Sequence, residues 1–154
     1  MLDFPTFVTR DDPSKDAGKV PSRGQIMELQ AEMLKIQNPM PEPEHFFAPG
    51  MYGRKLTIPA GMLMVGKTHK HAHLMMVLSG RATVITEFDR KEVAPGLVSV
   101  SQPGAKRVVL AHEDTVFVTV HHNPDDGQDL VAIEAHHIDS EADAIEQALK
   151  GELL

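Results

Sequence analysis

Between residues 45 and 138 the sequence divides into at least eight short apolar or alternating runs, each ended by a turn sequence. Alternation of apolar and polar residues is typical of half-buried β-strands, and Gly- and Pro-containing pairs are typical of tight turns. Many short strands of this kind in one domain predict a mainly β barrel or jelly roll. The clearest turn sequences are Pro59-Ala60-Gly61, Ser79-Gly80, Pro95-Gly96 and Pro103-Gly104.

The chain of 154 residues fits one domain, and its sequence divides into three parts. We predict an extended N-terminal arm with one amphipathic helix over residues 1–44, a β-barrel over residues 45–138, and a short C-terminal helix over residues 139–154. The last strand of the barrel is expected at residues 130–133, a short apolar run.

The N-terminal helix is predicted over residues 22–37. Ser22 and Gln25 form a capping-box pattern, and Ile26 and Leu29 begin an apolar stripe at helical spacing. This stripe fits packing on the chain's own barrel and packing in an oligomer interface equally well. The C-terminal helix is expected to begin at Ser140, where nearby acidic residues favour the positive end of a helix dipole.

Composition excludes several classes of function. The formal net charge is −7 and basic residues do not cluster, so no nucleic-acid partner is expected. There is no Cys, so disulfides and thiolate zinc sites are excluded. The sequence has neither a signal-peptide pattern nor an apolar run of the ~20 residues that a membrane span needs. We therefore expect a soluble protein of the cytoplasm, or one packaged from it, with no membrane partner.

Three histidines alternate along one stretch of the sequence. His69, His71 and His73 would lie on one face of an extended strand, because successive side chains point to opposite sides. Neighbours on that face lie ~6.6 Å apart and the outer pair ~13 Å apart in a straight strand. All three share one ion only if the strand bends or bulges. A metal or polar-ligand site is one interpretation, and a solvated histidine-rich edge is the other.

The residues around these histidines resemble a known family. Gly66, the three histidines and the apolar run that ends at Leu78-Ser79-Gly80 resemble the first motif of the cupin family of small β-barrels. Residues 94–107, which contain Pro95-Gly96 and Pro103-Gly104, resemble the second cupin motif. More narrowly, the chain is similar to small cupins encoded in tailed-phage and prophage genomes. The resemblance implies a single cupin-type jelly-roll β-barrel.

The resemblance also implies a metal site, with two departures from the family pattern. Metal-binding cupins take two His and one Glu from the first motif and one His from the second. Here the Glu position falls on His73 and the last His position falls on Arg107. Arg has no free lone pair for a metal, so Arg107 is a candidate ligand for an anion or a structural partner of a carboxylate. The predicted metal ligands are His69, His71, His73 and His121, and the predicted ion is divalent Zn, Fe, Ni or Mn.

The remaining polar residues give weaker predictions. His121 is a candidate only if its strand register turns it inward rather than His122. His112 is expected in an exposed turn, and the pair His136-His137 is expected on the surface. No catalytic residue is assigned; the acidic residues nearest in sequence are Glu87, Glu113 and Asp114.

Three functions are compatible with such a barrel. The favoured one is a phage-type cupin that forms a homo-oligomer through the N-terminal arm, with Phe4 and Phe7, and through the N-terminal helix. It would act as an assembly, virion-associated or binding protein in an infected bacterial cell. The alternatives are a metal-dependent enzyme, isomerase- or dioxygenase-like, on a small oxygen-rich substrate, and a non-catalytic sugar- or anion-binding module. A cupin fold alone does not choose between them.

Overall fold

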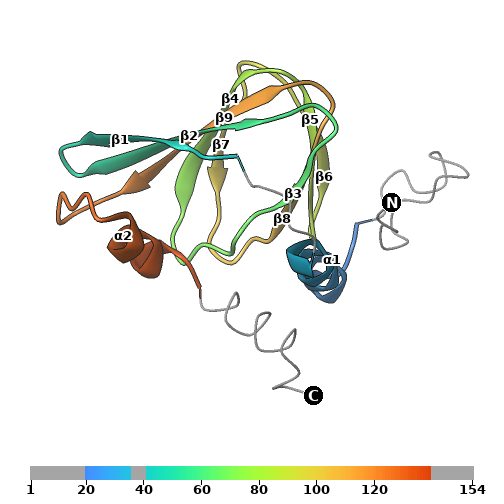
Figure 1. Ribbon diagram of the computed structural model, residues 1–154, viewed down its shortest axis with the longest axis horizontal. Helices are drawn as coiled ribbons and strands as arrows, with labels where there is room; N and C mark the ends of the chain where they lie inside the picture. The colour runs from blue at the N-terminus through green and yellow to red at the C-terminus, as the bar shows by residue number, and fades with distance from the viewer. Residues whose placement is uncertain (1–19, 36–40, 140–154) are drawn as a thin grey trace, which may run out of the picture.

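The computed structural model describes residues 20–35 and 41–139. This part of the chain forms two helices and nine strands (Figure 1). The expected N-terminal arm with Phe4 and Phe7, and the expected helix that begins at Ser140, lie outside the described residues. The elements are α1 (Arg23–Lys35), β1 (Glu44–Ala48), β2 (Met51–Ile58), β3 (Leu63–Val65), β4 (His73–Ser79), β5 (Ala82–Thr86), β6 (Arg90–Val93), β7 (Val98–Ser101), β8 (Arg107–Ala111), β9 (Thr115–His122) and α2 (Leu130–His137).

The strands form two antiparallel sheets that face each other (Figure 1). The larger sheet has the order β1-β2-β9-β4-β7, and the smaller sheet has the order β3-β8-β5-β6. Neighbours in each sheet are often distant in sequence, as β9 is from β2 and β4. The predicted mainly β jelly-roll barrel is thereby confirmed.

The core lies between the two sheets because one face of each strand is apolar. Phe117 of β9 and Val77 of β4 point inward and pair with each other, while their sequence neighbours point outward. Partly buried methionines complete the packing, as expected of a chain with nine Met and no Trp. The main cluster contains Leu56, Ile58, Val77, Ala82, Val84, Val93, Val109, Ala111 and Phe117.

The outer face of β4 and β7 carries exposed apolar side chains. Leu74 pairs across the strands with Val100, and Met76 pairs with Val98. Leu74 is 41% exposed, Val98 63% and Val100 57%, and Leu78 farther along β4 is also exposed. β7 is an edge strand of its sheet, so this apolar face continues to the sheet's border. We call these five residues the β4–β7 apolar face.

Helix α1 begins with the predicted capping box. The Ser22 backbone N–H donates to Gln25 Oε1 over 2.8 Å, and the Gln25 N–H donates to Ser22 Oγ over 3.2 Å. Ile26 and Leu29 are fully buried against the smaller sheet, where they pack in a cluster with Val65, Ile85 and Val108. Of the two expected roles for this stripe, packing on the chain's own barrel is therefore realised.

The turn at Gly80 needs glycine for two reasons. Its φ of 81° lies in the left-handed region, where other residues are strained. A Cβ at this position would lie 2.2 Å from the carbonyl oxygen of Asp114 and 2.6 Å from Cα of Thr115. The hairpin between β4 and β5 therefore passes directly over the β8–β9 connection, and no larger residue fits between them.

Residues 130–133 are helical, so the predicted last strand is wrong. They form the first half of α2, and the Asp129 side chain caps the helix by accepting a hydrogen bond from the Val131 N–H over 3.1 Å. Ile133 and His137 are the buried residues of this helix. Figure 1 shows α2 beside the barrel, next to the β1–β2 hairpin.

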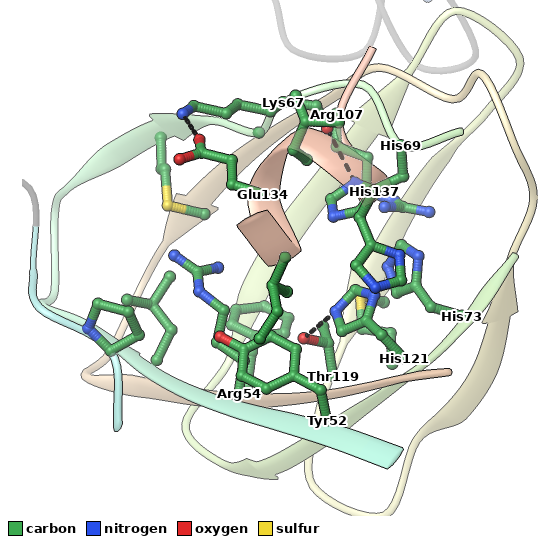
Figure 2. Close-up of a pocket in the computed structure, with 18 of the residues that line it drawn as sticks. Tyr52, Arg54, Lys67, His69, His73, Arg107, Thr119, His121, Glu134 and His137 are labelled. Carbon is green, nitrogen blue, oxygen red and sulfur yellow. Dashed lines mark hydrogen bonds and ion pairs between the residues drawn. The ribbon is translucent and has the colours of Figure 1, made fainter. Parts of the chain in front are cut away.

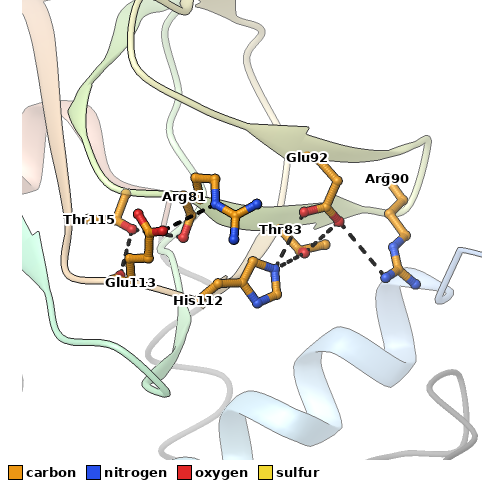
Figure 3. A network of polar contacts seen from close by, with 7 residues as sticks. All are labelled: Arg81, Thr83, Arg90, Glu92, His112, Glu113 and Thr115. Atoms are coloured by element: carbon orange, nitrogen blue, oxygen red, sulfur yellow. Dashed lines mark hydrogen bonds and ion pairs between the residues drawn. The ribbon is translucent and has the colours of Figure 1, made fainter.

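A polar network covers part of the outer face of the smaller sheet (Figure 3). Thr83 Oγ1 donates a hydrogen bond to Glu92 Oε1 over 2.6 Å. The Thr83 hydroxyl oxygen therefore accepts the second hydrogen bond, from His112 Nε2–H, which lies 2.6 Å away. His112 Nε2 also lies 3.4 Å from Glu92 Oε2. His112 is exposed, as predicted, and this network explains its fixed orientation.

Candidate metal centre

A cavity of about 430 Å³ opens between the two sheets at the end where α2 lies. β2, β4, β8 and β9 supply most of its walls, and α2 supplies one more (Figure 2). Its lining combines apolar residues with charged and imidazole side chains. The polar lining residues are His45, Tyr52, Arg54, Lys67, His69, His73, Arg107, Thr119, His121, Glu134 and His137.

Three histidines converge in this cavity. One ring nitrogen from each of His69, His73 and His121 lies within 4.8 Å of the others. The ring centroids of His69 and His73 are 4.4 Å apart, and those of His73 and His121 are 4.5 Å apart. β4 pairs with β9 at Leu74 and Val120, so His73 and His121 occupy the next register position on the inner face. We call these three residues the inner histidine group.

His71 does not join this group, contrary to the expectation that three alternating histidines share one face. β4 begins only at His73, and His69 forms an isolated bridge with Ile138. The chain bends between His69 and His73, which brings His69 back toward the cavity. The same bend turns His71 toward His122 and His136 on the other side.

The imidazoles of the inner histidine group are held in the neutral form. Burial is the main cause for each, and neighbouring cationic and imidazole groups add to it. The pKa of His69 and that of His73 are lowered to about 4, and the pKa of His121 is lowered to about 3. Neutral imidazoles present the lone pair that a metal ion needs.

Hydrogen bonds orient two of these rings and leave the third unpaired. His69 Nδ1–H donates to the Lys67 carbonyl over 3.0 Å, which leaves Nε2 as the bare nitrogen. His121 Nε2 lies 2.9 Å from Thr119 Oγ1, so Nδ1 remains available. His73 Nδ1 is buried and has no hydrogen-bond partner among the described residues. An unpaired buried nitrogen is costly unless a ligand binds it. The donor set therefore fits a divalent first-row transition metal.

Cationic groups stand beside the inner histidine group. Arg107 of β8 lines the cavity and donates a hydrogen bond to Ser101 Oγ. A guanidinium group cannot bind a metal ion, but it can bind an anion. Burial lowers the pKa of Arg107, and Asp89 opposes this shift. Arg54 of β2 lines the cavity as well. The two guanidinium groups make the cavity complementary to a small anion.

An aromatic ring supports His121 from behind. The Tyr52 ring stacks on the His121 ring with centroids 5.8 Å apart, and the Tyr52 hydroxyl lies 2.6 Å from His45 Nδ1. Burial raises the pKa of Tyr52, so its hydroxyl stays protonated at neutral pH. Tyr52 thus restricts the orientation of His121 and offers a hydroxyl to the cavity.

The cavity also contains residues that the sequence interpretation missed. Glu134 of α2 lines it and forms an ion pair with Lys67, marked in Figure 2. His137, expected on the surface, is buried and lines it as well, whereas His136 is exposed as expected. Assigning residues 130–133 to a strand concealed both Glu134 and His137. The signal was present in the Asp129 cap and in the helical spacing of Leu130, Ile133 and His137.

The acidic residues nearest in sequence to the predicted motifs do not line the cavity. Glu87 pairs with Arg23 of α1 over 3.2 Å, and Glu113 pairs with Arg81 over 3.3 Å. Asp114 Oδ1 accepts a hydrogen bond from the Ala60 N–H over 2.8 Å. Each of these carboxylates has a structural partner at the barrel surface.

Comparison with known proteins places the fold. No protein-family model matches the chain, and no curated protein sequence matches it. Among solved structures, a protein with a double-stranded β-helix domain from Klebsiella pneumoniae is 18% identical, with a TM-score of 0.50 over 60% of this chain and 84% of that one. The plu4264 protein from Photorhabdus luminescens is 13% identical, with a TM-score of 0.50 over 65% of this chain and 89% of that one. A cupin 2 conserved barrel domain protein from Salinispora arenicola is 16% identical, with a TM-score of 0.48 over 56% of this chain and 78% of that one.

The two similarities with a TM-score of 0.50 and the sheet topology define the class of the fold. The chain forms a cupin-type, double-stranded β-helix barrel, as the sequence motifs predicted. At these identities the likeness concerns the fold alone. No helix in the part of the chain that the structure describes is long and apolar enough to cross a membrane.

Proposed function

We propose that the barrel binds a divalent transition metal through the inner histidine group and uses this site to hold a small, oxygen-rich anion. One observation carries the proposal. Three neutral imidazoles converge to within 4.8 Å in a cavity, and one of them, His73, has a buried nitrogen without a hydrogen-bond partner. The expected ion is Zn, Fe, Ni or Mn, because imidazole suits these metals.

The other cavity residues support an anionic ligand. A metal ion bound here would supply a Lewis acid toward an oxygen atom of the ligand. Arg107 and Arg54 would each donate to a carboxylate, and a guanidinium can do so through two parallel hydrogen bonds. The volume of about 430 Å³ fits a small molecule. The charge of the lining thus favours small carboxylates over neutral sugars.

Turnover by this site would need a group that moves protons. Glu134 is the one carboxylate among the described cavity-lining residues, and its ion pair with Lys67 orients it. In an enzymatic reaction Glu134 would accept a proton from the bound molecule, and the protonated Tyr52 hydroxyl would donate a hydrogen bond. α2 carries Glu134, so the same helix that shields the cavity from water also supplies its base.

The test is a metal-dependent binding measurement on the full chain. Metal-free protein would be titrated by calorimetry with small mono- and dicarboxylates, before and after saturation with zinc or manganese. We expect binding that requires the ion and that is lost in His73→Ala. His112→Ala is the matched control, because His112 is a histidine outside both the cavity and the inner histidine group. Equal binding with and without metal, or none at all, contradicts the proposal.

The second candidate is the assembly role that the resemblance to phage-type cupins implies. The β4–β7 apolar face favours it, because Leu74, Val98 and Val100 are between 41% and 63% exposed at a sheet border. A second copy of the chain would cover this face in a homo-oligomer. Light scattering of Val98→Lys and Val100→Lys should then give a lower mass than the unmodified chain. An unchanged mass contradicts a role for this face.

A further inference from the structure

A second cluster of histidines lies outside the cavity. It consists of His71 from the bend before β4, His122 at the end of β9 and His136 in the last turn of α2. One ring nitrogen from each lies within 4.8 Å of the others. The ring centroids are 4.8 Å apart for His71 and His122, and 5.1 Å apart for His71 and His136. We call these residues the outer histidine group.

The spacing of the ring nitrogens suits a metal ion. His122 Nε2 and His136 Nε2 are 3.3 Å apart. Two nitrogens bound at about 2.0–2.1 Å with a tetrahedral angle between them are separated by about 3.3 Å. His71 supplies a third ring nitrogen within 4.8 Å of the other two. His122 and His136 are exposed, so water can fill the remaining position.

The two histidine groups are built from the same segments of chain. His121 and His122 are neighbours in β9, and His71 lies between His69 and His73. Alternation along β9 sends His121 inward and His122 outward. His137 stands between the groups, with its ring centroid 5.3 Å from that of His121 and 5.1 Å from that of His122. Each group has its own set of three ligands.

We propose that the outer histidine group is a second binding site for a divalent transition metal, and that this ion fastens α2 to the barrel. All-imidazole sites suit zinc, nickel and copper. The proposal rests on the geometry of the outer group and does not require an ion in the inner one.

The position of the outer group explains what the ion would do. α2 already contacts the segment before β4, where the Lys70 N–H donates to the His137 carbonyl over 2.7 Å and the Asp139 N–H donates to the Thr68 carbonyl over 2.9 Å. An ion on His136 and His122 adds a tie from α2 to the end of β9. Because α2 forms a wall of the cavity, this tie would slow the opening of the cavity.

Metal stoichiometry tests the proposal. Metal-free full chain would be titrated with zinc and counted by native mass spectrometry, in the unmodified protein, in His136→Gln and in His73→Ala. We expect two ions in the unmodified chain and one in each single variant. The double variant His73→Ala/His136→Gln should bind none. His112→Gln, which changes an exposed histidine outside both groups, should still bind two.

The outcomes separate this site from the inner one. One ion that persists in His73→Ala and is lost in His136→Gln supports the outer site even though the inner site has failed. One ion that is lost in His73→Ala and kept in His136→Gln overturns the proposal. A single ion lost in both variants, or no bound ion, overturns it as well.

Hydrogen exchange tests the effect on α2. In His73→Ala, where only the outer group is complete, zinc should slow amide exchange over residues 130–137 by about tenfold or more. The same addition to His73→Ala/His136→Gln should leave exchange unchanged. An equal response in both variants overturns the fastening of α2.

Discussion

His121 and His122 are consecutive residues of β9, and their imidazoles enter two different histidine groups on opposite sides of the strand. His121 is 5% exposed and faces the cavity, whereas His122 is exposed. Strand geometry alone requires this separation, because neighbouring side chains point in opposite directions. The two groups can therefore be removed one at a time by changing adjacent residues.

The first prediction uses this separation. Zinc should raise the Tm of the metal-free chain in two increments, because an ion that binds only the folded state stabilises it by mass action. At a hundredfold excess over Kd each increment amounts to ~2.7 kcal/mol, or about 5–10 °C in Tm. His121→Gln should lose the inner increment and His122→Gln the outer one, as measured by calorimetry. A full zinc response in His121→Gln would disprove the inner site.

The second prediction concerns Arg107. Replacing it with Met removes a charged hydrogen-bond donor from the cavity while keeping most of its apolar length. We expect carboxylate binding to the metal-loaded protein to weaken about 10- to 100-fold, which corresponds to the ~1.5–3 kcal/mol of a hydrogen bond to a charged group. Arg107→Lys should recover only part of this, because Lys cannot form two parallel bonds. Unchanged affinity in Arg107→Met would exclude Arg107 from the anion site.

The third prediction is a pH dependence of stability in the metal-free protein. The pKa of His69 and that of His73 are about 4 in the folded chain, against about 6.5 in an unfolded one. Between these values the unfolded chain binds more protons, so the free energy of unfolding falls as pH falls from about 6.5 to about 4. Urea denaturation at several pH values with a chelator measures this slope. The slope should be shallower in His69→Gln/His73→Gln, and an equal slope would refute the buried neutral state.

The fourth prediction concerns the turn at Gly80. Gly80→Ala introduces both a strained φ and a Cβ 2.2 Å from the Asp114 carbonyl oxygen, so it should cost more than ~2 kcal/mol of stability. Gly61→Ala is a matched control, since its φ is 80° and no atom lies within 4 Å of the added Cβ. Denaturation should show a loss of only ~1 kcal/mol there. Equal losses of stability in the two variants would mean that the close approach at Gly80 does not contribute to the free energy of unfolding.

Local patterns predicted those elements whose signals are local. The capping box at Ser22 and Gln25 formed as expected, and the Gly- and Pro-containing turns separated the strands. The strand prediction for residues 130–133 failed because a four-residue apolar run has no periodicity that distinguishes strand from helix. The Asp129 side chain caps a helix, and Ile133 and His137, four residues apart, are both buried, as expected on one face of a helix.

The candidate site depends on non-local contacts, and these were only partly predictable. Alternation placed His69, His71 and His73 on one face but could not show that the chain bends, which brings His69 to His73 and sends His71 elsewhere. The inward direction of His121 follows from the pairing of β4 with β9, and a shift of one residue would have reversed it. The phage origin and the oligomer implied by the resemblance stay predictions, as does the use of the N-terminal arm.

The order of the strands along the chain bears on how the protein is made. The inner histidine group takes His69 from the segment before β4, His73 from the first position of β4 and His121 from β9, which follows all the other strands of the described part of the chain. During synthesis at the ribosome, the first two imidazoles emerge long before the third. A growing chain therefore has no complete inner site until β9 has been made and has paired with β4. Uptake of the ion would mark the closure of the barrel, and the metal content of a preparation would report the fraction of molecules that have finished folding.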